Sequence, residues 1–175
     1  MKRIVTTVAI LIALIFSGQA QTLQKFFDKY ADDERFQYVA ISKGMMNMAS
    51  VFGGLAKDEK KMMQKMNGLK ILSLDADSES QIMKSVVREM DQIVSSGNFE
   101  SAVEARDKGE RVNIYYRVSG ANNADMLIVT REKTSFNCIW IKGNMTKQEL
   151  LNSFSKSGGG VQIGFVDISE PANAV

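Results

Sequence analysis

The chain has no histidine, and it has only one cysteine and one proline among its 175 residues. Without histidine, neither a Ser–His–Asp triad nor a Cys–His pair can form, and zinc sites that need histidine are excluded with them. The single cysteine, Cys138, cannot form a disulfide within the chain. Because Cys138 lies in the middle of an expected strand, we interpret its side chain as a small hydrophobic group buried in the core. We therefore predict no catalytic residue, no cofactor and no metal site.

An excess of charge of one sign is also missing, apart from the first residues. The chain has 22 basic and 20 acidic side chains, and the two extra basic ones are Lys2 and Arg3. Without the first 20 residues the net charge is therefore zero. A basic stripe that would suit nucleic acid is not found, so we predict no nucleic-acid partner.

The N-terminal segment has the pattern of a signal peptide. Lys2 and Arg3 precede an uncharged, mostly apolar run over residues 4–16, and a small-x-small motif ends at Ala20. This run is shorter than the ~20 residues that a membrane-spanning helix needs. We expect cleavage after Ala20, export to the periplasm or the cell exterior, and no stable membrane anchor in the mature protein.

Residues 99–143 read as four strands joined by short polar turns, over 99–106, 111–118, 125–131 and 136–142. In the second strand Val112, Ile114, Tyr116 and Val118 alternate with polar residues, which predicts a sheet with one solvent-facing side. Two earlier strands are expected over 36–41 and 69–74. Helices are expected over 23–30, over 43–66 as one bent helix or two, over 79–96, and from a capping box at Thr146.

This order of elements predicts an α+β fold, with a mainly antiparallel sheet and helices packed on one face. The expected organisation is a signal peptide over 1–20, a single α+β domain over 21–155, and a Gly-rich linker and C-terminal tail over 156–175. Within the tail, the sequence allows two alternatives for residues 161–168: a late strand, or a segment that becomes ordered only when a partner binds.

The best acidic motif is Asp75-x-Asp77-x-Glu79, which resembles the start of a calcium loop. It lacks the glycine and the bidentate glutamate that such a loop needs, so Asp77 or Ser78 is better interpreted as the cap of the following helix. A hydrolase that uses two Asp or Glu side chains stays open as an alternative, because their separation in space is not visible in a sequence.

Methionine is concentrated in one segment. Six of the eleven methionines lie within residues 45–66; they are Met45, Met46, Met48, Met62, Met63 and Met66. Their thioethers suit Cu(I), fill gaps in a core, or form an adaptable contact surface. Helical spacing places Met45, Met48, Met63 and Met66 on a core stripe. Met46, Val51 and Met62 lie at or beyond its edge, and we predict them as contacts for a protein partner or for self-association.

Several stretches together resemble a known family. They are Tyr38 to Met46, Ile71 to Ser73, Val112 to Tyr116 and Ile139 to Gly143. The set is similar to the domain-of-unknown-function family numbered four-two-five-two, found in exported proteins of Bacteroidetes. The resemblance implies export and a single domain, and it brings no activity or site residues.

The first functional hypothesis is an exported, non-catalytic module that binds a partner or regulates an envelope process. The alternatives are a hydrolase that depends on Asp and Glu, and a binder of Cu(I) through the clustered methionines.

Overall fold

The computed structural model describes residues 22–52, 54, 57–120 and 122–149. The predicted signal peptide, the Gly-rich tail and the candidate strand at 161–168 lie outside the described residues.

The first element is a helix over residues 22–31. The labelled elements that follow are β1 (Phe36–Ser42), α2 (Lys43–Phe52), α3 (Lys57–Lys65), β2 (Met66–Asp75), α4 (Gln81–Ser96), β3 (Glu100–Asp107), β4 (Glu110–Ser119), β5 (Asn123–Arg131) and β6 (Ser135–Gly143). The predicted α+β class is confirmed.

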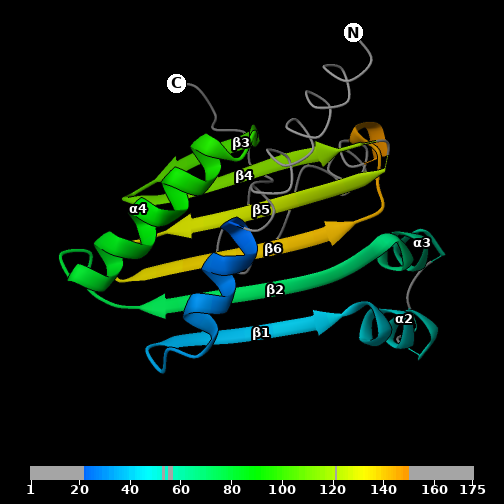
Figure 1. Ribbon diagram of the computed structural model, residues 1–175, viewed down its shortest axis with the longest axis horizontal. Helices are drawn as coiled ribbons and strands as arrows, with labels where there is room; N and C mark the ends of the chain where they lie inside the picture. Colours follow the sequence, from blue (N-terminus) through cyan, green and yellow to red (C-terminus); the bar gives the residue numbers. More distant parts are fainter. Residues whose placement is uncertain (1–21, 53, 55–56, 121, 150–175) are drawn as a thin grey trace, which may run out of the picture.

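All six strands form one antiparallel sheet in the order β1-β2-β6-β5-β4-β3. Strands β3 to β6 follow one another along the chain and are joined by short turns, as predicted. The β1–β2 pair attaches through the long pairing of β2 with β6, so β1 and β3 are the two edges of the sheet (Figure 1).

The helix over residues 22–31 and α4 lie side by side on one face of the sheet, here called the helix face (Figure 1). Four side chains of the first helix, Leu23, Phe26, Phe27 and Tyr30, are at most 3% exposed. They join Met83, Val86, Met90 and Ile93 of α4 over the middle of the sheet. Burial of this apolar area is the main stabilising contribution to the fold.

The start of α4 differs from the prediction, because its N-cap is Ser80. The Ser80 hydroxyl accepts a hydrogen bond from the Met83 amide at 3.3 Å. The Asp77 carboxylate instead accepts from the Glu79 amide at 2.8 Å, and so closes a turn before the helix. Short Asp and Ser side chains can accept a hydrogen bond from a backbone amide either in a turn or at the start of a helix. Their order along the chain therefore does not show which residue is the N-cap.

The opposite side of the sheet, here called the reverse face, is also apolar. One row of register partners crosses all six strands and consists only of β-branched residues: Val39, Ile71, Ile139, Ile128, Ile114 and Val103. Exposure along this row is 1% at Ile114 and 7% at Ile128, and it reaches 47% at Val39. The row is therefore most accessible at β1.

Residues 144–149 and α3 cover one corner of the reverse face. Met145 is buried there with Tyr116 and Ala124, and Met62 of α3 packs against the same cluster. The backbone amide of Asn144 donates to the Lys65 carbonyl at 2.7 Å. The chain after β6 is thus fixed to α3 before it continues.

The prediction of one solvent-facing side for β4 is wrong. Asn113 and Arg117 lie on the helix face, and they are only 5% and 6% exposed. The Arg117 guanidinium donates to the Asp125 carboxylate at 2.6 Å and to the Gly97 carbonyl at 3.1 Å. A buried charge is tolerated when it is paired and hydrogen-bonded in this way. Arg117 of β4 is therefore part of a buried network with Asp125 and the Gly97 carbonyl.

Cys138 is fully buried at the centre of the helix face, as predicted. Burial raises the pKa of its thiol above the ordinary value, because a thiolate there would lose its hydration. Since the thiolate is the reactive form, Cys138 is a packing residue of the core.

Candidate functional site

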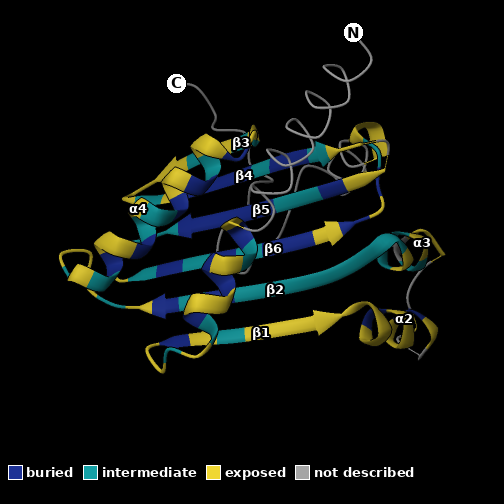
Figure 2. Ribbon diagram, in the orientation of Figure 1, coloured by how far each residue is buried: buried dark blue, intermediate teal, exposed yellow. Residues whose placement is uncertain are grey.

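The candidate site is an exposed apolar surface at one edge of the molecule, built from β1 and α2. Large apolar side chains are 36–61% exposed there; they are Val39 and Ile41 on β1, and Met45, Met48 and Val51 on α2. Figure 2 shows this region as largely exposed. We call these five residues the β1–α2 surface.

The segment that carries this surface is poor in charge. Between Phe36 and Phe52 the only charged side chain is Lys43. On α2 the exposed residues Met45, Met48 and Val51 recur every three positions, so they lie on one side of the helix. Five large apolar side chains with this exposure on one short segment make it a candidate contact surface.

The three predicted contact residues have different positions in the structure. Val51 is 60% exposed and belongs to the β1–α2 surface. Met46 is only 5% exposed, so it offers almost no area to a partner. Met62 is half-buried and packs against the cluster around Met145. Val51 is therefore the one predicted contact that the structure leaves available.

The predicted core stripe of this segment is also wrong at two positions, since Met45 and Met48 are 61% and 60% exposed. The reason is where the helix lies. Because α2 begins at Lys43, directly after β1, it continues past the end of the strand instead of folding back over a sheet face (Figure 1). Helical periodicity gives a stripe, but it does not say what the stripe packs against.

The open choice between one bent helix and two is resolved in favour of two helices. Helix α2 ends at Phe52 and α3 begins at Lys57, and Gly54 between them has a φ of 62°. A positive φ of this kind is readily adopted by glycine. Met66 is the first residue of β2 and not the end of the helix.

The methionines do not share one environment. Met45 and Met48 are exposed, whereas Met46 is buried and Met62 packs on the reverse face. In the described residues, no group of three or more His, Cys, Asp or Glu side chains is arranged to hold a metal ion. A thioether site for Cu(I) would need several of these sulfurs to converge on one point.

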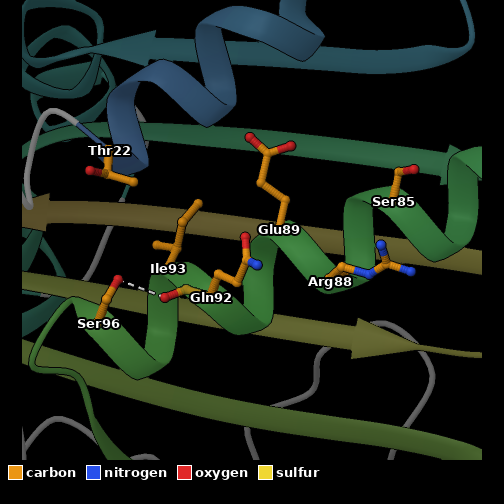
Figure 3. A pocket seen from close by; sticks show the side chains of 7 residues that line it. All are labelled: Thr22, Ser85, Arg88, Glu89, Gln92, Ile93 and Ser96. Atoms are coloured by element: carbon orange, nitrogen blue, oxygen red, sulfur yellow. Dashed lines mark hydrogen bonds between the residues drawn. The ribbon is translucent and has the colours of Figure 1, made fainter.

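A depression of about 470 Å³ lies on the helix side of the molecule, between the start of the first helix and α4. Figure 3 shows the side chains that line it; they are Thr22, Ser85, Arg88, Glu89, Gln92, Ile93 and Ser96. Glu89 is its one carboxylate, and it accepts hydrogen bonds from Lys29 at 2.6 Å and Tyr30 at 3.0 Å. A hydrolase of the two-carboxylate type needs a second acid facing this group.

The two edges of the sheet differ in a way that bears on the candidate surface. Edge strand β3 carries Glu100, Glu104, Arg106 and Asp107, and its register with β4 shifts between Ser101 and Val103. Charges and a bulge are the usual protection of an edge strand against pairing with another chain. Strand β1 is uncharged over all seven residues and pairs with β2 in an unbroken register. Among the described residues, these protective features are present on β3 and absent from β1.

An acidic loop precedes β1. The Arg35 side chain binds Asp33 through two hydrogen bonds of 2.6 and 2.9 Å, and these bonds hold the pKa of Asp33 at about 2. Asp33 therefore stays ionised at any physiological pH. With Asp32 and Glu34, the loop keeps a net negative charge at one end of β1, while Lys43 stands at the other end.

Comparison with known families supports the resemblance seen in the sequence. A profile of the family described as "Domain of unknown function (DUF4252)" matches residues 30–152. The match covers more than half of the chain, so the protein belongs to this family. Searches of curated proteins and of solved structures gave no match.

The match begins within the first helix and runs through β6, so it includes the β1–α2 surface. Among the described residues, no helix is both long enough and apolar enough to cross a bilayer.

Proposed function

We propose that the protein is an exported, non-catalytic module that binds a protein partner through the β1–α2 surface. The observation that carries this proposal is the exposure of five large apolar side chains on one nearly uncharged segment. Aromatic residues and methionine are typical of protein contacts, and methionine adapts its shape to a partner at low cost. In an exported protein, a contact of this kind would take place outside the cytoplasm. The role that we propose is therefore in an envelope process.

Export is the second part of the proposal. It is supported by the charged start, the short apolar run and the small residues before Gln21. The resemblance to exported proteins of Bacteroidetes supports a periplasmic or extracellular location as well. Mass spectrometry of the protein from its native cell should give Gln21 as the first residue. An N-terminus that still carries Lys2 and Arg3 would contradict export with cleavage.

Contact through the β1–α2 surface can be tested by site-specific photocrosslinking in the native cell. A photoreactive amino acid in place of Met48, which is 60% exposed, should give one adduct of defined mass after irradiation. The same amino acid in place of Ala102, an exposed residue on the opposite edge strand, is the matched control and should give none.

A second variant separates a specific contact from random collision. Adding Val51→Gln to the chain with the photoreactive residue at 48 removes a neighbouring apolar group that is 60% exposed. Loss of one apolar contact should lower the adduct yield several-fold, while the thermal midpoint changes little because Val51 is not in the core. Equal adducts at positions 48 and 102, or none at 48, would refute the proposed surface.

A further inference from the structure

We propose that the partner at the β1–α2 surface is a second copy of this chain, and that two β1 strands pair antiparallel across a two-fold axis at Val39. This inference rests on the proposed function and names its partner. It would join the two sheets into one twelve-stranded sheet, since each copy contributes six strands.

The first argument is the contrast between the two edges. An unprotected edge strand presents backbone N–H and C=O groups that pair readily with another strand. Strand β3 carries charges and a bulge, whereas the seven residues of β1 have neither. Among the described residues, no strand pairs with the outer side of β1. Because β3 is protected in this way and β1 is not, the contrast indicates that β1 pairs with a strand of another chain.

The second argument is the row of β-branched residues on the reverse face. It ends at Val39, the middle residue of β1 and its most exposed member at 47%. In a two-fold pair centred there, Val39 lies beside Val39 of the second copy and the row continues without a break. Neighbouring β-branched side chains stabilise such strand pairs. Because the axis is perpendicular to the sheet, the helix faces of both copies stay on the same side.

The third argument is charge, which selects the antiparallel arrangement. Strand β1 has the acidic loop of residues 32–34 at its start and Lys43 just after its end. Antiparallel pairing brings each Lys43 to the loop of residues 32–35 in the other copy, where Arg35 lies opposite it but three acidic side chains leave the loop with a net negative charge. Parallel pairing would place the two acidic loops together. Since residues 36–42 are uncharged, no like charges face each other within β1 itself.

The register gives a charge-swap experiment that is specific for self-pairing. Val39→Lys and Val39→Asp each place a charge opposite its own copy, so each variant alone should dimerise at least about tenfold more weakly than wild type at low salt. An equimolar mixture of the two should recover the dimer, because Lys then faces Asp. Analytical ultracentrifugation of the purified proteins measures all three. Ala102→Lys, on the opposite edge, is the control and should dimerise like wild type.

A second measurement does not depend on weakening the contact. Val39→Cys should give a disulfide-linked dimer on mild oxidation, because facing Cα atoms in an antiparallel pair lie about 4.5–5.5 Å apart, within the range that a disulfide spans. The native Cys138 is fully buried and does not compete. Ala102→Cys should stay monomeric on a non-reducing gel.

The outcomes separate this inference from the proposed function. A wild-type protein that is monomeric, with an adduct to a different protein at position 48, would refute self-pairing and leave the proposed function standing. A monomer without any adduct would refute both. A wild-type dimer that persists in both charge variants, or whose variants do not recover on mixing, would show that another surface is used and would overturn the inference.

Discussion

Replacing Arg117 by methionine should lower the free energy of unfolding by about 3–5 kcal/mol, measured by denaturant titration. The side chains of Arg117 and Asp125 are only 6% and 15% exposed, and they are joined by a contact of 2.6 Å. Methionine keeps most of the volume but leaves the Asp125 carboxylate buried without its cation. The remaining hydrogen bond from Trp140 to Asp125, at 3.0 Å, does not neutralise that charge.

An exposed arginine supplies the matched control. Arg106→Met removes an ion pair with Glu104 whose side chains are 62% and 48% exposed, and it should change stability by less than about 0.5 kcal/mol. The double variant Arg117→Met with Asp125→Leu should cost less than the sum of the two single variants, because each single change already breaks the same pair. A small effect of Arg117→Met would show that water reaches the network.

Replacing Phe27 by alanine should cost about 3–5 kcal/mol, because it leaves a cavity between the first helix and the sheet. Phe27 is fully buried, with ring centroids 5.5 Å from Trp140 and 5.7 Å from Phe26. The helix over residues 22–31 is only about three turns long and is held through few side chains. Loss of this ring therefore weakens the attachment of the whole helix.

Lys25→Ala in the same helix is the control, since Lys25 is exposed and alanine is a good helix former. Its effect should lie within about 0.5 kcal/mol in the same denaturant titration. If Phe27→Ala were equally mild, the first helix would not be part of the cooperative unit.

The β3–β6 meander was predictable because the signals for it are local. Period-2 alternation gives each strand, and short polar turns give the connections, so the predicted and observed boundaries differ by at most two residues. The capping box at Thr146 is local as well, and it forms as predicted: the Glu149 amide donates to the Thr146 hydroxyl at 3.2 Å and the Thr146 amide to the Glu149 carboxylate at 3.1 Å. Such features need only a few consecutive residues.

Which face of β4 meets the helices was not predictable from alternation alone. Both faces of this strand become buried, one through Val112 and Ile114 and the other through Arg117. Arg117 is accommodated by Asp125, which stands opposite it on β5. A cross-strand pair of opposite charges at one register position is the signal that would have indicated a buried network.

The candidate surface was found only in part for a similar reason. The unusual width of the apolar side of residues 43–66 was visible in the sequence, and Val51 is exposed as expected. Met45 and Met48 were predicted to be packed and Met46 to be exposed, whereas the structure shows the reverse. The environment of these side chains depends on where α2 lies relative to the sheet. Helix α2 begins at Lys43, directly after the last residue of β1, so there is no connecting loop that could turn the helix back over the sheet. This direct connection was the available sign that the helix continues beyond β1.

The strand order has a consequence for how the sheet assembles. Strands β3 to β6 pair with their neighbours along the chain, so closing their short turns costs little conformational entropy. Strand β2 must find β6 across α4 and three intervening strands, and such distant pairing is slow. Within the part of the chain that the structure describes, β1 is hydrogen-bonded to β2 alone. We therefore expect β1 to be the last strand to join the sheet during folding and, in a single unpaired copy, the first whose backbone amides exchange with solvent when the sheet opens from its edge.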